Sequence, residues 1–191
     1  MGGRDAGALS RLLDRGLSPD SGREVTLLTV ALRRPSEGLV SGMAGGGPGG
    51  GEKMAEMLLA HGADPNLVDA YGIPPLCYAV QECSVKMVER LLEKGAKVNG
   101  GVVQGTRSAD ELKLRGGAAI GRTALSMAAM RWNENPAIVN ALLAAGADPN
   151  IVDAKGKTAL DYLRSGDWRA APGVEAALMA KGAKTAAEVG K

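Results

Sequence analysis

Few side chains in this sequence have the chemistry for catalysis or metal binding. Its one histidine, His61, comes one residue before Gly62, where a predicted helix ends. A positively charged side chain there favours the negative end of the helix, so this position indicates a structural role. The two cysteines, Cys77 and Cys83, lie on different sides of a predicted helix end, which favours reduced packing residues over a disulfide. One histidine and two cysteines do not make a metal-ligand cluster.

Two segments match parts of phosphate-binding loops, but neither match is complete. The run Lys155-Gly156-Lys157-Thr158 has the end of a Walker motif, yet the first glycine that this motif needs is replaced by Ile151. The glycine run at 45–51 is followed by Glu52 and Lys53, and a phosphate loop needs Lys followed by Ser or Thr. The carboxylates alternate with lysines and arginines, as on a solvated surface. We therefore predict no catalytic residue, metal, cofactor or small-molecule substrate, and hence no enzyme activity.

The elements that position these side chains repeat along the chain. A phrase that begins with Leu-Leu or Leu-Met contains a glycine at residues 16, 62, 95, 146 and 182, so the spacings are 46, 33, 51 and 36. Each copy predicts the end of an amphipathic helix, because glycine fits the left-handed conformation that closes a helix. Such repetition indicates a solenoid.

A second phrase lies between these copies and predicts the starts of inner helices. It reads TLLTVA, PPLCYA, TALSMA and TALDYL. Thr26, Thr123 and Thr158 are suitable N-caps, and Pro75 suits the first helical position because it has no amide hydrogen to donate.

The order of the two phrases resembles the ankyrin repeat, D-x-x-G-x-T-P-L-H-x-A followed by L-L-x-x-G-A-D-x-N. DAYGIPPLCYA precedes LLEKGAKVN, and DAKGKTALDYL follows LLAAGADPN. The resemblance implies an all-α solenoid of about four helix pairs behind a leading outer helix. The family's histidine is replaced by Thr29, Cys77, Ser126 and Asp161, and its threonine by Pro74 in the second pair. Because the family residues hydrogen-bond neighbouring turns, we expect a looser stack than a consensus array.

We predict a single domain over residues 1–191. Its parts are a leading outer helix at 5–16, repeats at about 21–66, 69–99, 118–150 and 153–185, and a tail at 186–191. A Gly-rich insertion at 37–52 is predicted to be a loop without regular structure. A second insertion at 100–120 is predicted to project as a finger with a short helix over SADELKLR. Its role stays open between a surface loop and a partner-contacting element.

The resemblance also implies a partner-binding face on the turn tips and the outward side of the inner helices. The predicted contact residues are Arg23, Arg33, Arg34, Tyr71, Ile73, Gln81, Arg122, Met130, Arg131, Trp132, Lys155 and Lys157. Together with Val25 and Glu82, seven of these fourteen positions are basic and one is acidic, which predicts a basic groove. Trp132 beside Arg131 is the leading candidate for an anchor, and capping of the core by Trp132 is the equal alternative.

These patterns predict a non-catalytic scaffold or adaptor that is monomeric alone and binds a protein with an acidic surface. The net charge of +2 is too small to indicate nucleic acid. No apolar span is long enough for a membrane helix, and the N-terminus lacks a signal-peptide pattern, so we expect the cytoplasm, with the nucleus left open. The alternatives are binding of nucleic acid or anionic lipid through the same basic face, and a regulatory subunit of a larger enzyme.

Overall fold

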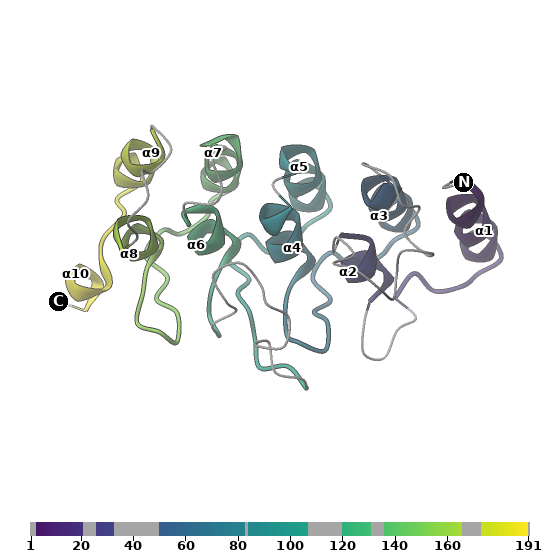
Figure 1. Ribbon diagram of the computed structural model, residues 1–191, viewed down its shortest axis with the longest axis horizontal. Helices are drawn as coiled ribbons and strands as arrows, with labels where there is room; N and C mark the ends of the chain where they lie inside the picture. The colour runs from purple at the N-terminus through teal and green to yellow at the C-terminus, as the bar shows by residue number, and fades with distance from the viewer. Residues whose placement is uncertain are drawn as a thin grey trace.

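The computed structural model describes residues 3–20, 26–32, 50–82, 84–106, 120–130, 136–165 and 173–190, and its helices lie in two rows (Figure 1). The outer row contains α1 (Gly3–Asp14), α3 (Gly50–Ala60), α5 (Val85–Glu93), α7 (Pro136–Ala144) and α9 (Val174–Ala180). The inner row contains α2 (Leu27–Leu32), α4 (Pro75–Gln81), α6 (Ala124–Ala128) and α8 (Ala159–Arg164), and α10 (Ala186–Val189) follows the last pair. The inner helices contact one another in chain order, and each contacts the outer helix that follows it.

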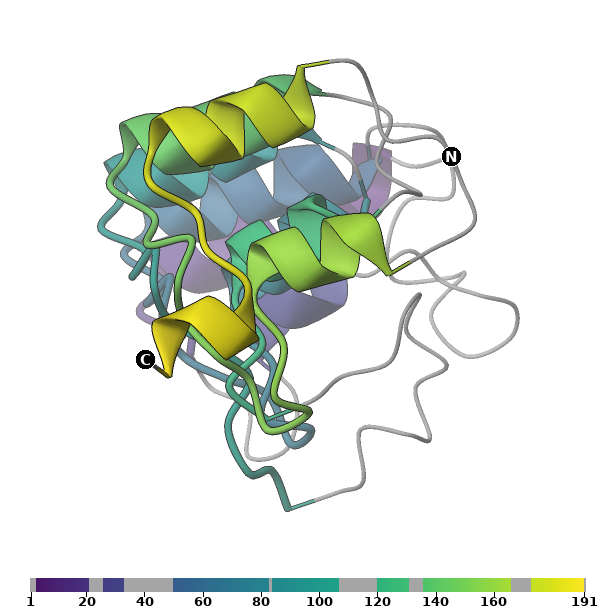
Figure 2. The ribbon, with the colours of Figure 1, turned by 90° about the vertical axis from the view of Figure 1, so that its left-hand side faces the viewer.

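The connecting turns extend from the inner row, on the side away from the outer row (Figure 2). This arrangement confirms the predicted all-α solenoid. None of the helices in the described ranges is both long and apolar enough to cross a membrane.

The inner helices begin where the sequence predicts. The Thr123 and Thr158 side chains cap α6 and α8, and Pro74 precedes Pro75 at the start of α4. At α2 the hydroxyl of Thr26 accepts a hydrogen bond from the Thr29 amide at 3.1 Å. Threonine succeeds at these positions because its oxygen satisfies an amide that has no partner within the first helical turn.

Polar side chains replace most of the family's histidine contacts. Ser126 Oγ accepts a hydrogen bond from the Thr123 amide at 3.0 Å, and Asp161 Oδ2 accepts one from the Thr158 amide at 2.9 Å. Thr29 Oγ1 donates to the Thr26 carbonyl oxygen at 3.0 Å. The second pair differs, because Cys77 and Pro74 offer no comparable polar pair of side chains. A local polar pair is therefore present at the starts of α2, α6 and α8.

Asparagine side chains join each repeat to the next one. Asn66 accepts from the Lys97 amide at 2.7 Å and donates to the Gly95 carbonyl at 3.0 Å. Asn99 and Asn150 make the same two contacts with the following repeats. The first junction has Asp20, whose carboxylate accepts from the Asp64 amide at 3.2 Å but has no hydrogen to donate. We call the Asn66, Asn99 and Asn150 contacts the asparagine ladder.

Small and aliphatic side chains fill the space between the rows, as the absence of phenylalanine predicts. Leu58, Leu91 and Leu142 are completely buried. The helical spacing of the apolar residues predicts that Leu92 is core together with Leu91, but Leu92 is only half-buried at the edge of that core. The corresponding second leucines of α3 and α7, Leu59 and Leu143, are buried, so Leu92 is the exception among these three outer helices.

The structure shifts three predicted boundaries. Helix α1 covers Gly3–Asp14, two residues earlier than predicted at each end. Helix α3 starts at Gly50, so the last residues assigned to the Gly-rich insertion are helical. The predicted tail contains α10, because Thr185 and Glu188 form a capping box and the Ala186 amide donates to Asp161 Oδ2 at 2.8 Å.

The base of the predicted finger pairs with the chain that returns from it. Gly101 and Thr123 form an antiparallel bridge, and the Val102 amide donates to the Arg122 carbonyl at 2.9 Å. The Val103 amide in turn donates to the Gly72 carbonyl at 2.9 Å, which ties this base to the preceding turn. The rest of the finger, including the predicted helix over SADELKLR, lies outside the described residues, as do residues 33–49, which include 37–49 of the Gly-rich insertion.

Candidate functional site

The structure describes part of the predicted contact face. Arg23, Arg33, Arg34, Arg131 and Trp132 lie outside the described residues, so the choice between anchor and core cap for Trp132 stays open. Tyr71, Gln81 and Lys157 are partly exposed, and Lys155 is exposed.

Three predicted contact residues are buried, which corrects their assignment to an exposed face. Ile73 and Arg122 are each 1% exposed, and Met130 is 8% exposed. Ile73 belongs to the hydrophobic core beside α4. Met130 is an apolar side chain that remains buried just after α6 ends. Arg122 is buried because its guanidinium reaches acceptors in the next repeat.

A buried aspartate shapes the turn that carries the two lysines. Asp153 Oδ1 accepts hydrogen bonds from the amides of Lys155 at 2.9 Å and Lys157 at 3.2 Å. Its other oxygen, Oδ2, accepts from the Tyr162 hydroxyl at 2.6 Å and lies 3.6 Å from Arg122 Nε. The turn therefore presents its lysines from a backbone that one carboxylate holds in place.

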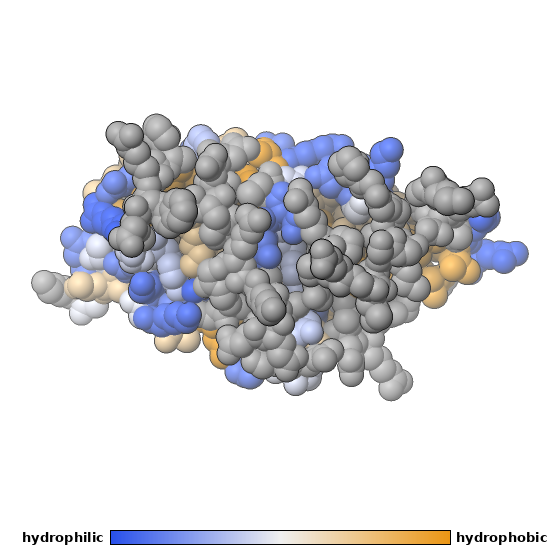
Figure 3. Space-filling model, in the orientation of Figure 1, coloured by the Kyte–Doolittle hydropathy of each residue, from blue (hydrophilic) through white to orange (hydrophobic). Residues whose placement is uncertain are grey.

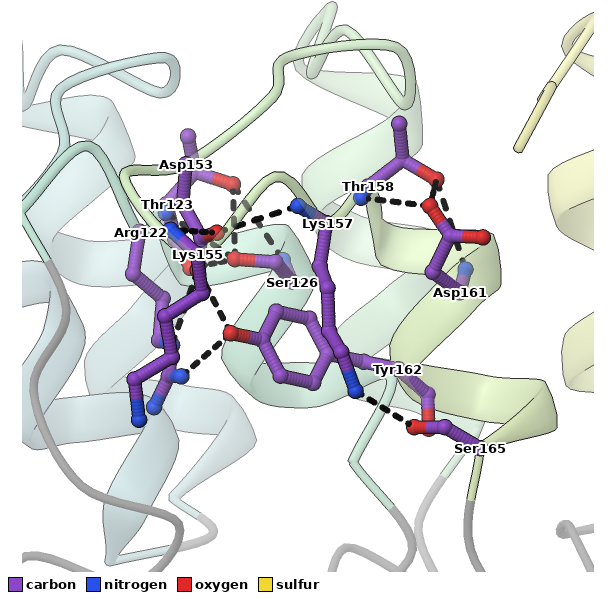
Figure 4. A network of polar contacts seen from close by, with 10 residues as sticks. All are labelled: Arg122, Thr123, Ser126, Asp153, Lys155, Lys157, Thr158, Asp161, Tyr162 and Ser165. Carbon is purple, nitrogen blue, oxygen red and sulfur yellow. Dashed lines mark hydrogen bonds and ion pairs between the residues drawn. The ribbon is translucent and has the colours of Figure 1, made fainter. Parts of the chain in front are cut away.

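The ring of Tyr162 lies between cations from two repeats (Figure 4). Arg122 comes from the third helix pair, donates to the Tyr162 hydroxyl, and places its guanidinium carbon 4.5 Å from the ring centroid. Lys157 Nζ lies 5.3 Å from the same centroid and donates to Ser165 Oγ at 3.3 Å. Cation–π attraction and hydrogen bonding together orient both cations. We call Arg122, Asp153, Lys155, Lys157 and Tyr162 the Tyr162 cluster.

The protonation of the Tyr162 cluster suits a binding surface more than an acid–base site. Burial raises the pKa of Tyr162, and the hydrogen bond to Asp153 raises it further, although Arg122 opposes the shift. The phenol thus remains a neutral donor around neutral pH. Lys155 and Lys157 are left as the cations that an anionic group from outside can approach.

The second repeat contains the same aspartate and tyrosine in the same arrangement. Asp69 Oδ1 accepts from the amides of Tyr71 at 3.0 Å and Ile73 at 3.1 Å, and Tyr78 donates to Asp69 Oδ2 at 2.6 Å. Sequence reasoning missed these pairs. The available signal was an aspartate nine residues before a tyrosine in both repeats. In the second repeat Tyr71 and Ile73 stand where the fourth has Lys155 and Lys157.

Among the described residues, neither Cys77 nor His61 is placed for nucleophilic or proton-transfer chemistry. Burial raises the pKa of the Cys77 thiol to about 12, against a smaller opposite effect from the charge of Arg122, so the thiol stays protonated. His61 contacts the Met57 carbonyl through Nδ1 at 2.9 Å and Asp14 through Nε2 at 3.1 Å. It joins α3 to α1 near the end of α3, as expected of a structural residue. Cys83 lies outside the described residues.

Two family models match the chain. One, described as "Ankyrin repeat", matches residues 120–154, and the other, "Ankyrin repeats (many copies)", matches residues 49–92. The first segment contains both Arg122 and Asp153, so the cluster spans one matched unit and the start of the next.

Three curated proteins are similar over more than half of this chain. E3 ubiquitin-protein ligase KEG of Arabidopsis thaliana is 31% identical over 112 residues, which are 58% of this chain and 6% of that protein. E3 ubiquitin-protein ligase Ufd4 of Drosophila melanogaster is 36% identical over 113 residues, covering 59% of this chain and 3% of the relative. Rabankyrin-5 of Mus musculus is 35% identical over 109 residues, which are 57% of this chain and 9% of that protein. The chain thus spans less than a tenth of the length of each of these relatives.

Proposed function

The chain belongs to the ankyrin-repeat family, whose repeats are protein-interaction modules, and on that premise we propose that it is a non-catalytic scaffold or adaptor. It binds a protein partner with an acidic surface through the inner helices and the turns, is monomeric in the absence of that partner, and works in the cytoplasm, with the nucleus as the alternative. The ligase activity in the names of two relatives is not part of this proposal.

The Tyr162 cluster is the observation that carries the proposal. Lys155 and Lys157 are placed on a turn that buried Asp153 holds, so the backbone of the turn loses little conformational freedom when these lysines meet carboxylates. Tyr162 is partly exposed beside them and offers the aromatic surface that is common at energetic hot spots. Arg122 supports this surface from beneath, and Arg23, Arg33, Arg34, Arg131 and Trp132 remain candidates to extend it.

A charge-reversal experiment tests the proposal. A tagged wild-type chain and the double variant Lys155→Glu with Lys157→Glu are used to capture proteins from the native cells, with mass spectrometry as the readout. We expect the double variant to lose the partner, with affinity at least about tenfold weaker once the partner is purified. The matched control reverses Lys53 and Lys94, two exposed lysines of the outer row, and should retain the partner.

The same variants separate the alternative functions. Duplex DNA, single-stranded RNA and vesicles with phosphatidylserine serve as anionic probes at low and high salt. Binding that falls steeply with salt and tolerates Tyr162→Ala would favour a nucleic-acid or lipid surface over a protein-binding one. Retention of the protein partner by the lysine double variant would refute the proposed face.

A further inference from the structure

A small apolar hollow lies at the junction of the second helix pair with the base of the finger. Its walls include Pro65, Val68, Pro74, Leu76 and Val103, with Lys97 at its edge, and its volume is about 190 Å³. We call this hollow the junction pocket. It shares no residue with the Tyr162 cluster.

A proline opens one side of the junction pocket. In the fourth pair the Thr158 hydroxyl, at the start of α8, donates to the Lys184 carbonyl in the turn after α9 at 2.8 Å. Pro74 holds the place of Thr158, two residues after a glycine with positive φ, and Lys97 holds the place of Lys184, two residues after a helix-ending glycine. Because proline has no hydroxyl, Pro74 cannot make this contact with Lys97, and an apolar ring lines the space instead.

Two glycines open the other side. Gly100 and Gly101 follow Asn99, whereas Ile151 and Val152 follow the equivalent Asn150. A Cβ atom on Gly101 would lie 2.9 Å from the Gly121 carbonyl oxygen, so the hairpin at the base of the finger requires a glycine there. The missing side chains leave the pocket unfilled.

The size and lining of the junction pocket fit one apolar side chain. An apolar protein cavity of about 150 Å³ can hold benzene, whereas pockets for drug-sized ligands usually exceed about 300 Å³. Val103 is 46% exposed at this site, which leaves apolar surface for a partner to cover. A leucine or phenylalanine side chain would bury that surface.

Lys97 gives the occupant a charge preference. It is exposed, and its backbone is fixed because its amide donates to Asn66 Oδ1 at 2.7 Å. Lys97 is also the charged residue among the described residues that line the pocket. We propose that the junction pocket binds a leucine or phenylalanine side chain in an extended acidic segment of a protein partner, with a neighbouring carboxylate paired to Lys97.

Short synthetic peptides test this site without knowledge of the partner. The probe is acetyl-Gly-Asp-Leu-Asp-Gly-amide, with one control in which serine replaces leucine and another in which lysine replaces both aspartates. Methyl resonances of Val68, Leu76 and Val103 report on the pocket in the full chain. Val152 and Leu160, which hold the places of Val68 and Leu76 in the fourth pair, serve as internal references.

We expect the acidic leucine peptide to shift the three pocket methyls with little change at the references, and both control peptides to bind at least about tenfold more weakly. Lys97→Glu should reverse the preference in favour of the lysine peptide. Pro74→Thr, which restores the residue type of Thr123 and Thr158, should narrow the pocket and weaken binding in a folded chain. Equal shifts with the serine peptide, or an unchanged preference in Lys97→Glu, would overturn the inference. Lys155 and Lys157 are unchanged in these variants. A failure of the junction pocket to bind these peptides would therefore leave the proposed function, which the lysine double variant tests, unaffected.

Discussion

Among the residues that the structure describes, Arg122 is the largest fully buried side chain, although arginine is usually a surface residue. A guanidinium loses its hydration on burial, so it needs strong partners inside the protein. Asp153 and Tyr162 provide them, and both belong to the unit after the one that carries Arg122. One side chain therefore connects two units electrostatically.

Replacement of Arg122 by methionine should lower the free energy of unfolding by about 3 kcal/mol, because it leaves the buried Asp153 carboxylate without its cation. Urea unfolding followed by circular dichroism measures this change. The matched control is Arg164→Met, which breaks the exposed ion pair with Glu175 and should cost less than about 1 kcal/mol. Equal losses for the two variants would show that the Arg122 contacts add no net stability.

His61 should make stability depend on pH in a defined direction. Its pKa is raised above 6.5, first by the Met57 carbonyl and then by Asp14, so the folded state favours the protonated ring. The resulting stabilisation is fully present below the unfolded pKa of about 6.5 and is lost as pH rises through the higher folded value. The melting temperature of wild type should therefore exceed that of His61→Gln by more at about pH 5.5 than at about pH 8.5. A melting-temperature difference between wild type and His61→Gln that grows as pH rises would contradict the predicted stabilisation by the protonated ring.

At the scale of single elements, the start of α3 shows a glycine with a packing role. A Cβ atom on Gly51 would lie 2.4 Å from the carbonyl oxygen of Ala31, so the absence of a side chain lets α3 approach the end of α2. Glu52, the next residue, accepts a hydrogen bond from Ser84 Oγ at 2.5 Å. The glycine run thus ends in residues that dock a helix.

Glycine-to-alanine substitutions at two helical positions should have opposite effects. Gly51→Ala should destabilise the protein by about 1–3 kcal/mol, because the new methyl group meets backbone. Gly7→Ala in α1 should stabilise it by about 0.5–1 kcal/mol, because the nearest atom, at 3.9 Å, belongs to the flexible Arg11 side chain and alanine favours the helix. Thermal unfolding of both variants checks the signs. A higher melting temperature for Gly51→Ala would show that α2 and α3 can move apart without a loss of stability.

At the scale of the whole molecule, the array is held together by the stacked rows and by the asparagine ladder. Hydrophilic surface lies around α8 and α9, and at the end that carries α1 apolar surface lies beside hydrophilic surface (Figure 3). Leu12 and Leu17 are 49% and 38% exposed at that end. In a solenoid, end units with fewer neighbours are the first to unfold.

Truncation of a central core residue should weaken the stack far more than truncation beside it. Leu91→Ala should cost about 2–5 kcal/mol, because Leu91 is completely buried between the rows. Leu92→Ala in the same helix is the matched control and should cost less than half as much. Denaturant unfolding measures both, and hydrogen exchange should show earlier opening of α1 and α10 than of α5. Equal costs for the two leucines would contradict the burial pattern.

The sequence is sufficient to predict where the helices begin and end, but it is insufficient to predict the side-chain contacts between helices of different units. The positions where helices begin, at Thr123 and Thr158, and end, at the repeated glycines, depend on local backbone chemistry. Neighbouring residues in the sequence reveal that chemistry. The burial of Arg122 depends on an aspartate 31 positions later, and the position of Arg122 on a turn tip does not disclose it. Likewise, the sequence shows that Pro74 departs from the threonine of the ankyrin pattern. The pocket beside it also depends on Gly100 and Gly101 at the base of the finger, and the sequence does not show that they lie next to Pro74.

The asparagine ladder has a further consequence for how this protein can be altered. Its donor contacts join residues 29, 47 and 32 positions apart, yet the geometry of each rung is alike. The ladder therefore sets the distance between units in space, whatever length of chain separates them. New sequence could be grafted between Thr106 and Ile120, beyond the paired base of the finger, without a change in the register of the units on either side. The array should therefore accept a reporter domain, or a longer natural loop, at this point.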